Sequence, residues 1–133
     1  MTIKAVLFDL DGTLADTAPD LGGALNRLRE ECGLAPLPLS QLRPHASAGA
    51  RGLLGAGFGL TTDQPLYAEM QKRFLAQYES QICADTRLFP GVNDLLTELE
   101  SRDIAWGIVT NKIACFTRPL LACLGLDTRA ACV

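Results

Sequence analysis

An apolar run that stops at two carboxylates is the feature that most constrains the fold of this chain. Residues 3 to 8 read IKAVLF, a short apolar stretch without polar alternation, which predicts a buried strand. Asp9 and Asp11 follow directly, and then come Gly12 and Thr13. In parallel α/β sheets, ligand sites lie at the carboxyl ends of the strands. The stretch therefore predicts an α/β fold with a polar site directly after its first strand.

A second apolar run with a polar end supports the same fold class. Residues 104 to 109 predict another buried strand, and Thr110, Asn111 and Lys112 follow it. Because the carboxyl ends of parallel strands share one edge of a sheet, we expect the two polar loops to meet. This second loop is the natural partner of the first.

Helical periodicity fills most of the remaining chain. Because several helices separate the two strands, we expect a helical insertion over residues 16–84 between two core segments, 1–15 and 85–133. The expected helices are one capped by Thr17 with Leu21, Leu25, Leu28 and Cys32 on one face, one over 47–58, a long one capped by Asp63, one after the Pro90–Gly91 turn, and one from Thr117 to Leu124 with Pro119 in its first turn.

Composition and charge narrow the classes of function. The chain has 133 residues, of which 48% are hydrophobic and 20% charged, as expected of a globular protein. A net charge of −3 and the lack of a Lys/Arg cluster argue against nucleic acid as a partner. No apolar run is long enough for a membrane span and no export signal is evident, so we expect a cytoplasmic protein without a membrane partner. Five scattered cysteines without a C-x-x-C pair do not favour zinc.

The carboxylates Asp9 and Asp11 indicate a metal-assisted reaction. Two carboxylates in one crevice repel each other unless a cation or a proton lies between them. A hard divalent ion with oxygen ligands, Mg²⁺ above all, relieves that repulsion. Gly12 permits a tight turn, and the exposed amide expected at Thr13 would contribute to an anion-binding nest. Carboxylates, Mg²⁺ and a nest together predict phosphoryl chemistry, in which Asp9 attacks phosphorus and Asp11 serves as general acid and base.

The second loop supplies groups that suit a phosphate. The Thr110 hydroxyl and the Asn111 amide can donate hydrogen bonds to phosphate oxygens. The Lys112 ammonium lies close by in the sequence, and it suits either phosphate binding or a solvated position. The sequence leaves that alternative open.

Three motifs resemble those of the haloacid dehalogenase-like phosphatases. FDLDGTLADT, residues 8–17, resembles their first motif, and IVTNK, residues 108–112, resembles their second. FPGV, residues 89–92, precedes the second motif as it does in the family. The order also matches, with a helical cap inserted after the first motif. The closest resemblance is to the phosphoglycolate phosphatase-like branch, which includes N-acetylmuramic acid 6-phosphate phosphatases.

The resemblance implies a Rossmann-like core and a role for each motif residue. Asp9 would be the nucleophile and a metal ligand, and Asp11 would be the acid/base and bind Mg²⁺ through its backbone carbonyl. In the cap, Arg51 and His45 would contact the substrate, although both are also ordinary solvated side chains. The residues expected around the phosphate are Asp9, Leu10, Thr110, Asn111 and Lys112.

The family pattern is incomplete in this sequence. The family has a third-motif lysine and a fourth-motif acidic pair downstream of the second motif, and neither occurs before Val133. The Rossmann-like core is therefore expected to hold only the first two motif strands, as the N-terminal part of a longer enzyme. The strand over residues 3–8 would then have an open edge.

The expected function is Mg²⁺-dependent hydrolysis of a small phosphomonoester through an aspartyl-phosphate. Phosphoglycolate is the default substrate by resemblance, and N-acetylmuramic acid 6-phosphate is the next. A sugar phosphomutase is an alternative within the family. A catalytically incomplete fragment that binds phosphate or a partner is the alternative from another class.

Overall fold

The computed structural model describes residues 2–133 and divides the chain into two compact units. One unit combines the residues up to Asp16 with Arg87–Val133, and the other unit is Thr17–Thr86. The limits expected from the sequence, 16 and 84, lie close to these. The first unit contains both strands and helices, whereas the second contains helices alone. The α/β fold class is confirmed.

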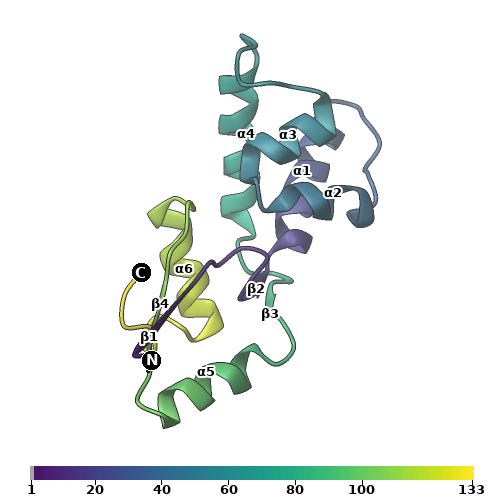
Figure 1. The fold of residues 1–133 in the computed structure, drawn as a ribbon. Helices are drawn as coiled ribbons and strands as arrows, with labels where there is room; N and C mark the ends of the chain where they lie inside the picture. Colours follow the sequence, from purple (N-terminus) through teal and green to yellow (C-terminus); the bar gives the residue numbers. More distant parts are fainter. Residues whose placement is uncertain (1) are drawn as a thin grey trace. The chain divides into compact units, whose positions relative to one another are not determined.

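The α/β unit is built on a parallel pair of strands (Figure 1). β1 (Ala5–Phe8) and β4 (Ala105–Ile108) pair along their whole length. The Val109 amide donates a hydrogen bond to the Phe8 carbonyl at 2.8 Å. Pairing therefore continues to the point where the two polar loops leave the sheet.

The two edges of this sheet differ. On the far edge of β4, the Ala131 amide donates to the Trp106 carbonyl at 2.8 Å, and the Ile108 amide donates to the Cys132 carbonyl at 3.0 Å. Along β1, by contrast, Leu7 is 62% exposed. The expectation of a buried first strand is wrong, because none of the residues Ala5–Phe8 is buried on either face of the sheet.

Two helices and a short ribbon complete the α/β unit. The helices are α5 (Val92–Ser101) and α6 (Ala114–Leu124). β2 (Ala15–Asp16) pairs with β3 (Arg87–Leu88) in antiparallel fashion. The buried apolar side chains of this unit are Leu10, Leu14, Ala15, Leu96, Trp106, Ile108, Phe116, Leu120, Leu121 and Leu126.

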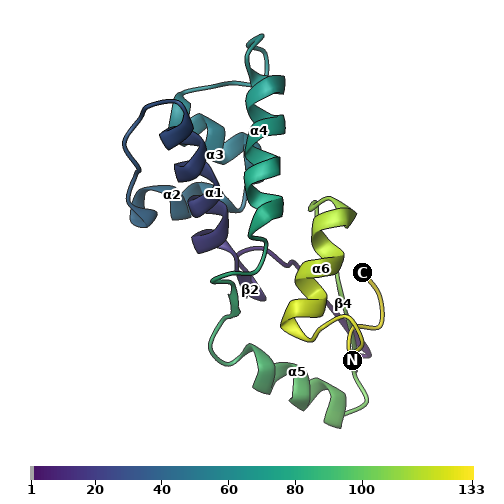
Figure 2. The same cartoon turned by 180° about the vertical axis from the view of Figure 1, so that it is seen from behind.

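Four helices make up the second unit. They are α1 (Ala18–Glu31), α2 (Leu39–Ala46), α3 (Gly49–Phe58) and α4 (Tyr67–Ser80). α1 and α4 lie side by side in both views (Figure 1 and Figure 2). The apolar face of each helix turns inward, as helical periodicity requires. The core comprises Leu21, Leu25, Leu28, Leu42, Leu53, Leu54, Met70, Phe74 and Tyr78.

A buried carboxylate ties the first helix of this unit to its last residues. Asp20, in the first turn of α1, is only 4% exposed. Both of its carboxylate oxygens accept the Asp85 amide at 3.0 Å. Its Oδ2 atom also accepts the Thr86 amide at 2.9 Å and the Thr86 hydroxyl at 2.6 Å. Thr17, the expected cap of α1, occupies the N-cap position but makes no side-chain capping bond.

Two expected helix starts are wrong. α4 begins at Tyr67, because Asp63 accepts a hydrogen bond from the Thr61 hydroxyl within a separate turn and does not cap the helix. α6 begins at Ala114, so Thr117 lies inside it and donates its hydroxyl to the Ile113 carbonyl at 3.0 Å. Within residues 2–133, no helix is long and apolar enough to cross a bilayer.

Candidate active site

The first loop, residues 9–14, leaves β1 as a tight turn around one carbonyl group. The Leu10 carbonyl accepts hydrogen bonds from the amides of residues 13, 14 and 15 at 3.2, 3.1 and 3.0 Å. Gly12 has φ of 78°, a left-handed conformation that glycine adopts readily. The side chains of Leu10 and Leu14 are buried, whereas Asp9 is exposed. Two leucines therefore anchor the turn and leave Asp9 at the surface.

The amides of this loop do not form the expected anion nest at Gly12 and Thr13. The Gly12 amide donates to the Ala15 carbonyl at 2.9 Å, and the Thr13 amide donates to the Leu10 carbonyl at 3.2 Å. Both donors are used inside the turn, so the expectation of an available Thr13 amide is wrong. The amides of this turn therefore bond to carbonyl groups of the same turn.

The second loop is held by its own side-chain hydrogen bonds. The Lys112 amide donates to the Thr110 hydroxyl oxygen at 3.1 Å. The Thr117 hydroxyl, from the first turn of α6, donates to the Lys112 carbonyl at 3.2 Å. Since the Thr110 oxygen accepts from within the loop, its hydroxyl proton is the part that can be offered to an anion. Asn111 is exposed between these two anchored residues.

One ion pair joins the two loops. The Lys112 ammonium lies 3.0 Å from the Asp11 carboxylate, and the two side chains are only 8% and 16% exposed. The solvated position considered for Lys112 is therefore wrong. Burial lowers the pKa of the Lys112 ammonium, and the neighbouring Asp11 charge opposes that shift. The expected meeting of the two loops is realised through this contact.

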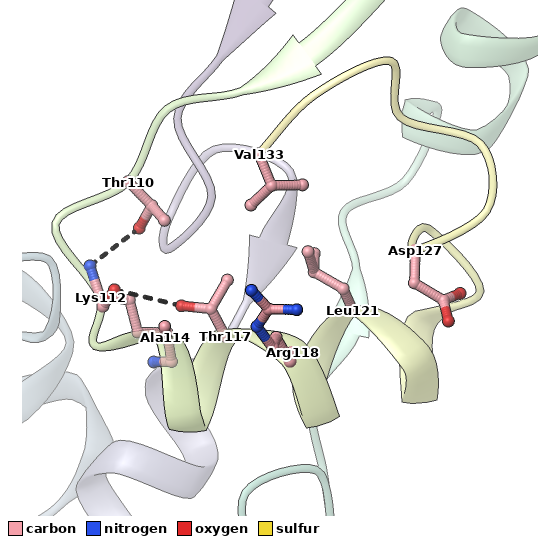
Figure 3. A pocket seen from close by; sticks show the side chains of 8 residues that line it. All are labelled: Thr110, Lys112, Ala114, Thr117, Arg118, Leu121, Asp127 and Val133. Carbon is pink, nitrogen blue, oxygen red and sulfur yellow. Dashed lines mark hydrogen bonds between the residues drawn. The ribbon is translucent and has the colours of Figure 1, made fainter.

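A pocket of about 480 Å³ opens beside the second loop (Figure 3). Thr110 and Lys112 come from the loop, while Thr117, Arg118 and Leu121 come from α6. Arg118 adds a cation to the pocket that the sequence did not reveal. The local sequence does not show in which direction an exposed side chain on a helix points. The residues that line the pocket are Thr110, Lys112, Ala114, Thr117, Arg118, Leu121, Asp127 and Val133.

The expected Mg²⁺ ion would bind at the first loop, beside Asp9 and Asp11. Within residues 2–133, no three His, Cys, Asp or Glu side chains are grouped closely enough to hold a metal. Mg²⁺ in phosphoryl-transfer sites usually takes one or two carboxylates and completes its shell with water and substrate phosphate. The exposed Asp9 carboxylate fits that pattern, and Asp11, whose carboxylate is paired with Lys112, could contribute its backbone carbonyl; these are the residues that could hold the ion.

The two other expected substrate contacts, His45 and Arg51, lie in the helical unit. His45 is exposed near the end of α2, and Arg51 is exposed in the first turn of α3. A Cβ atom at Gly52 would lie 2.4 Å from the His45 carbonyl oxygen, so the two helices approach closely here. The role of both residues in substrate recognition stays a prediction.

Comparison with known proteins identifies the family. The model of the haloacid dehalogenase-like hydrolases matches residues 6–131. The chain belongs to this family. The resemblance carried by the first and second motifs is thereby confirmed.

Named relatives fall in the expected branch. The chain is 38% identical over 130 residues to an N-acetylmuramic acid 6-phosphate phosphatase of Pseudomonas aeruginosa, covering 98% of this chain and 58% of the relative. It is 41% identical over 128 residues to a phosphoglycolate phosphatase of Xanthomonas campestris pv. campestris, covering 96% of this chain and 58% of the relative. The chain thus spans well under two thirds of the length of these haloacid dehalogenase-like relatives.

A solved structure has the same fold. The crystal structure of a predicted phosphoglycolate phosphatase from Haemophilus somnus 129pt superposes with a TM-score of 0.82 at 25% sequence identity. The match covers 99% of this chain and 62% of that structure. The arrangement of strands and helices described above is therefore that of haloacid dehalogenase-like hydrolases.

Proposed function

We propose that this chain provides the nucleophile and phosphate-binding loops of a phosphomonoester hydrolase. The observation that carries the proposal is the pair of loops at the carboxyl ends of β1 and β4. The first presents the exposed Asp9 carboxylate, and the second presents Thr110 and Asn111. Membership of the haloacid dehalogenase-like hydrolases and the phosphatase names of the relatives support it.

The proposed reaction has two displacements at phosphorus. An Asp9 carboxylate oxygen forms a bond to phosphorus while the bond to the substrate alkoxide breaks, and that alkoxide takes a proton from Asp11. Asp11 then removes a proton from water, and the water oxygen displaces Asp9 from the aspartyl-phosphate, which releases inorganic phosphate. Thr110 and Asn111 hold the non-bridging phosphate oxygens throughout. When bound by Asp9 and Asp11, Mg²⁺ would supply positive charge to offset the negative charge of the phosphate.

The proposed substrate is a small phosphorylated metabolite. Phosphoglycolate is the default by resemblance, and N-acetylmuramic acid 6-phosphate is close behind, since relatives with both names resemble this chain to a similar degree. Leu10 would take part through its backbone, since its side chain is buried.

The decisive experiment measures phosphate release with and without Mg²⁺. Both this chain and a form extended past Val133 are assayed on phosphoglycolate, N-acetylmuramic acid 6-phosphate and an aryl phosphate. Asp9→Asn is expected to reduce release to background, because an amide cannot form the aspartyl-phosphate. Asp94→Asn, which makes the same change at an exposed position of α5, is expected to retain activity.

The outcomes separate the candidate functions. Activity that survives Asp9→Asn would contradict the proposed nucleophile. Activity only in the extended form would show that downstream residues complete the site. No activity in either form would overturn the hydrolase proposal and leave the binding module as the better account.

A further inference from the structure

The Lys112–Asp11 ion pair links the two loops by residues far apart in the sequence. Each partner projects from a loop that is fixed independently of the pair. The Lys112 backbone is held by Thr110 and Thr117, and the Asp11 backbone belongs to the turn around the Leu10 carbonyl. The pair therefore joins two preformed loops directly beyond the last β1–β4 hydrogen bond.

We propose that Lys112 is a positioning residue for Asp11, an inference that rests on the proposed function. Its ammonium holds the Asp11 carboxylate at 3.0 Å, on a stem that is nine-tenths buried. A side chain on a short loop has several rotamers, and only those near the leaving oxygen allow proton transfer. Lys112 selects the Asp11 rotamer and also fixes the second loop, with Thr110 and Asn111, against the first.

This role differs from that of a phosphate ligand. A lysine ammonium has three N–H donors, so contact with Asp11 does not by itself exclude contact with a phosphate oxygen. The kinetic consequences differ, however. Loss of a phosphate ligand weakens the binding of substrate and of inorganic phosphate, whereas loss of a positioning residue lowers kcat and leaves those affinities nearly unchanged.

The test compares Lys112→Met with the wild type in the form of the protein that releases phosphate. Methionine keeps most of the length of the stem and removes the charge. We expect kcat to fall by about tenfold or more, because small errors in the placement of a reacting group reduce rates steeply. The inhibition constant of inorganic phosphate is expected to change by less than about threefold. Lys72→Met, at an exposed position of α4, is the matched control and is expected to leave both quantities unchanged.

Two further measurements distinguish loss of the ion pair from loss of the folded structure. Lys112→Arg keeps the charge and is expected to recover part of the lost kcat. Asp11→Asn, Lys112→Met and the double variant are unfolded in urea, where the two changes are expected to be non-additive because they remove the same contact. Additive effects would contradict the ion pair itself.

The results also separate this inference from the proposed function. An unchanged kcat in Lys112→Met, or a kcat retained with phosphate inhibition weakened tenfold, would overturn the positioning role alone. A wild type without phosphatase activity in any form would overturn the proposed function, and the positioning role with it.

Discussion

The buried Asp20 carboxylate is expected to be the most sensitive polar position of the helical unit. It is 4% exposed and receives hydrogen bonds from the Asp85 amide, the Thr86 amide and the Thr86 hydroxyl. These bonds fasten residues 85–86 to the first turn of α1, at the opposite end of the unit's sequence. The perturbation proposed is Asp20→Asn, which preserves the shape of the side chain.

The size of the effect follows from those contacts. A hydrogen bond to a charged group contributes about 1.5–3 kcal/mol, and a neutral one contributes about 0.5–1.5 kcal/mol. Asparagine offers one acceptor oxygen, which can retain both bonds from Thr86 in weaker, neutral form. Its NH₂ group takes the place of Oδ1, so the Asp85 amide keeps only its contact with the remaining oxygen and now also faces a second donor. Allowing for local relaxation, we expect Asp20→Asn to lower the free energy of unfolding by about 3 kcal/mol.

Urea unfolding followed by circular dichroism measures this loss. Because the chain has two units, hydrogen exchange at the Asp85 and Thr86 amides is measured as well, and their protection is expected to fall. Asp85→Asn is the matched control: its side chain is exposed and only its backbone amide meets Asp20, so a change within about 0.5 kcal/mol is expected. If Asp20→Asn were no more destabilising than this control, the carboxylate would not hold the ends of the unit together.

Two other predictions concern packing and charge. A Cβ atom at Gly57 would lie 2.7 Å from a methyl carbon of Leu25, so Gly57→Ala is expected to lower the free energy of unfolding by about 1–3 kcal/mol. A Cβ atom at Gly55 would have its nearest contact at 3.7 Å, so Gly55→Ala, the matched control, is expected to raise the free energy of unfolding slightly. Both are read from urea midpoints, and equal effects would contradict the tight contact between α1 and α3. The Arg129 hydrogen bond lowers the pKa of Glu100, so this carboxylate stabilises the fold above the ordinary pKa of glutamate and loses that effect as the pH falls through its lowered pKa. The stability difference between wild type and Glu100→Gln is expected to shrink over that acid range, and a difference independent of pH would contradict the assignment.

The strands and helix faces could be predicted from sequence because their signals are local. The apolar runs that became β1 and β4, and the buried leucines of α1, follow from burial and periodicity alone. Cys32, expected on the same face of α1 as the leucines, is exposed because the helix ends at Glu31. A periodic pattern does not show where the helix carrying it stops.

The two misplaced helix starts have a common physical cause. A polar residue before an apolar stretch is typical of a cap, but the same side chain can satisfy a nearer partner. Asp63 accepts the Thr61 hydroxyl, and Thr117 donates back to Ile113 inside α6. Local hydrogen bonds of this kind compete with capping, and the sequence alone does not rank them.

The two carboxylates of the first loop are close enough in the sequence to repel each other. Asp9 and Asp11 are one residue apart, and two like charges at the end of an apolar strand are unfavourable unless their environments differ or a cation intervenes. The structure supplies both remedies, since Asp9 is exposed while Asp11 is largely buried against the Lys112 ammonium. The motif pointed to Asp9 and Asp11 but did not predict this pairing, because the cation lies far along the chain. An accessible carboxylate is also what a nucleophile needs, so the exposed side chain of Asp9 agrees with the role proposed for it.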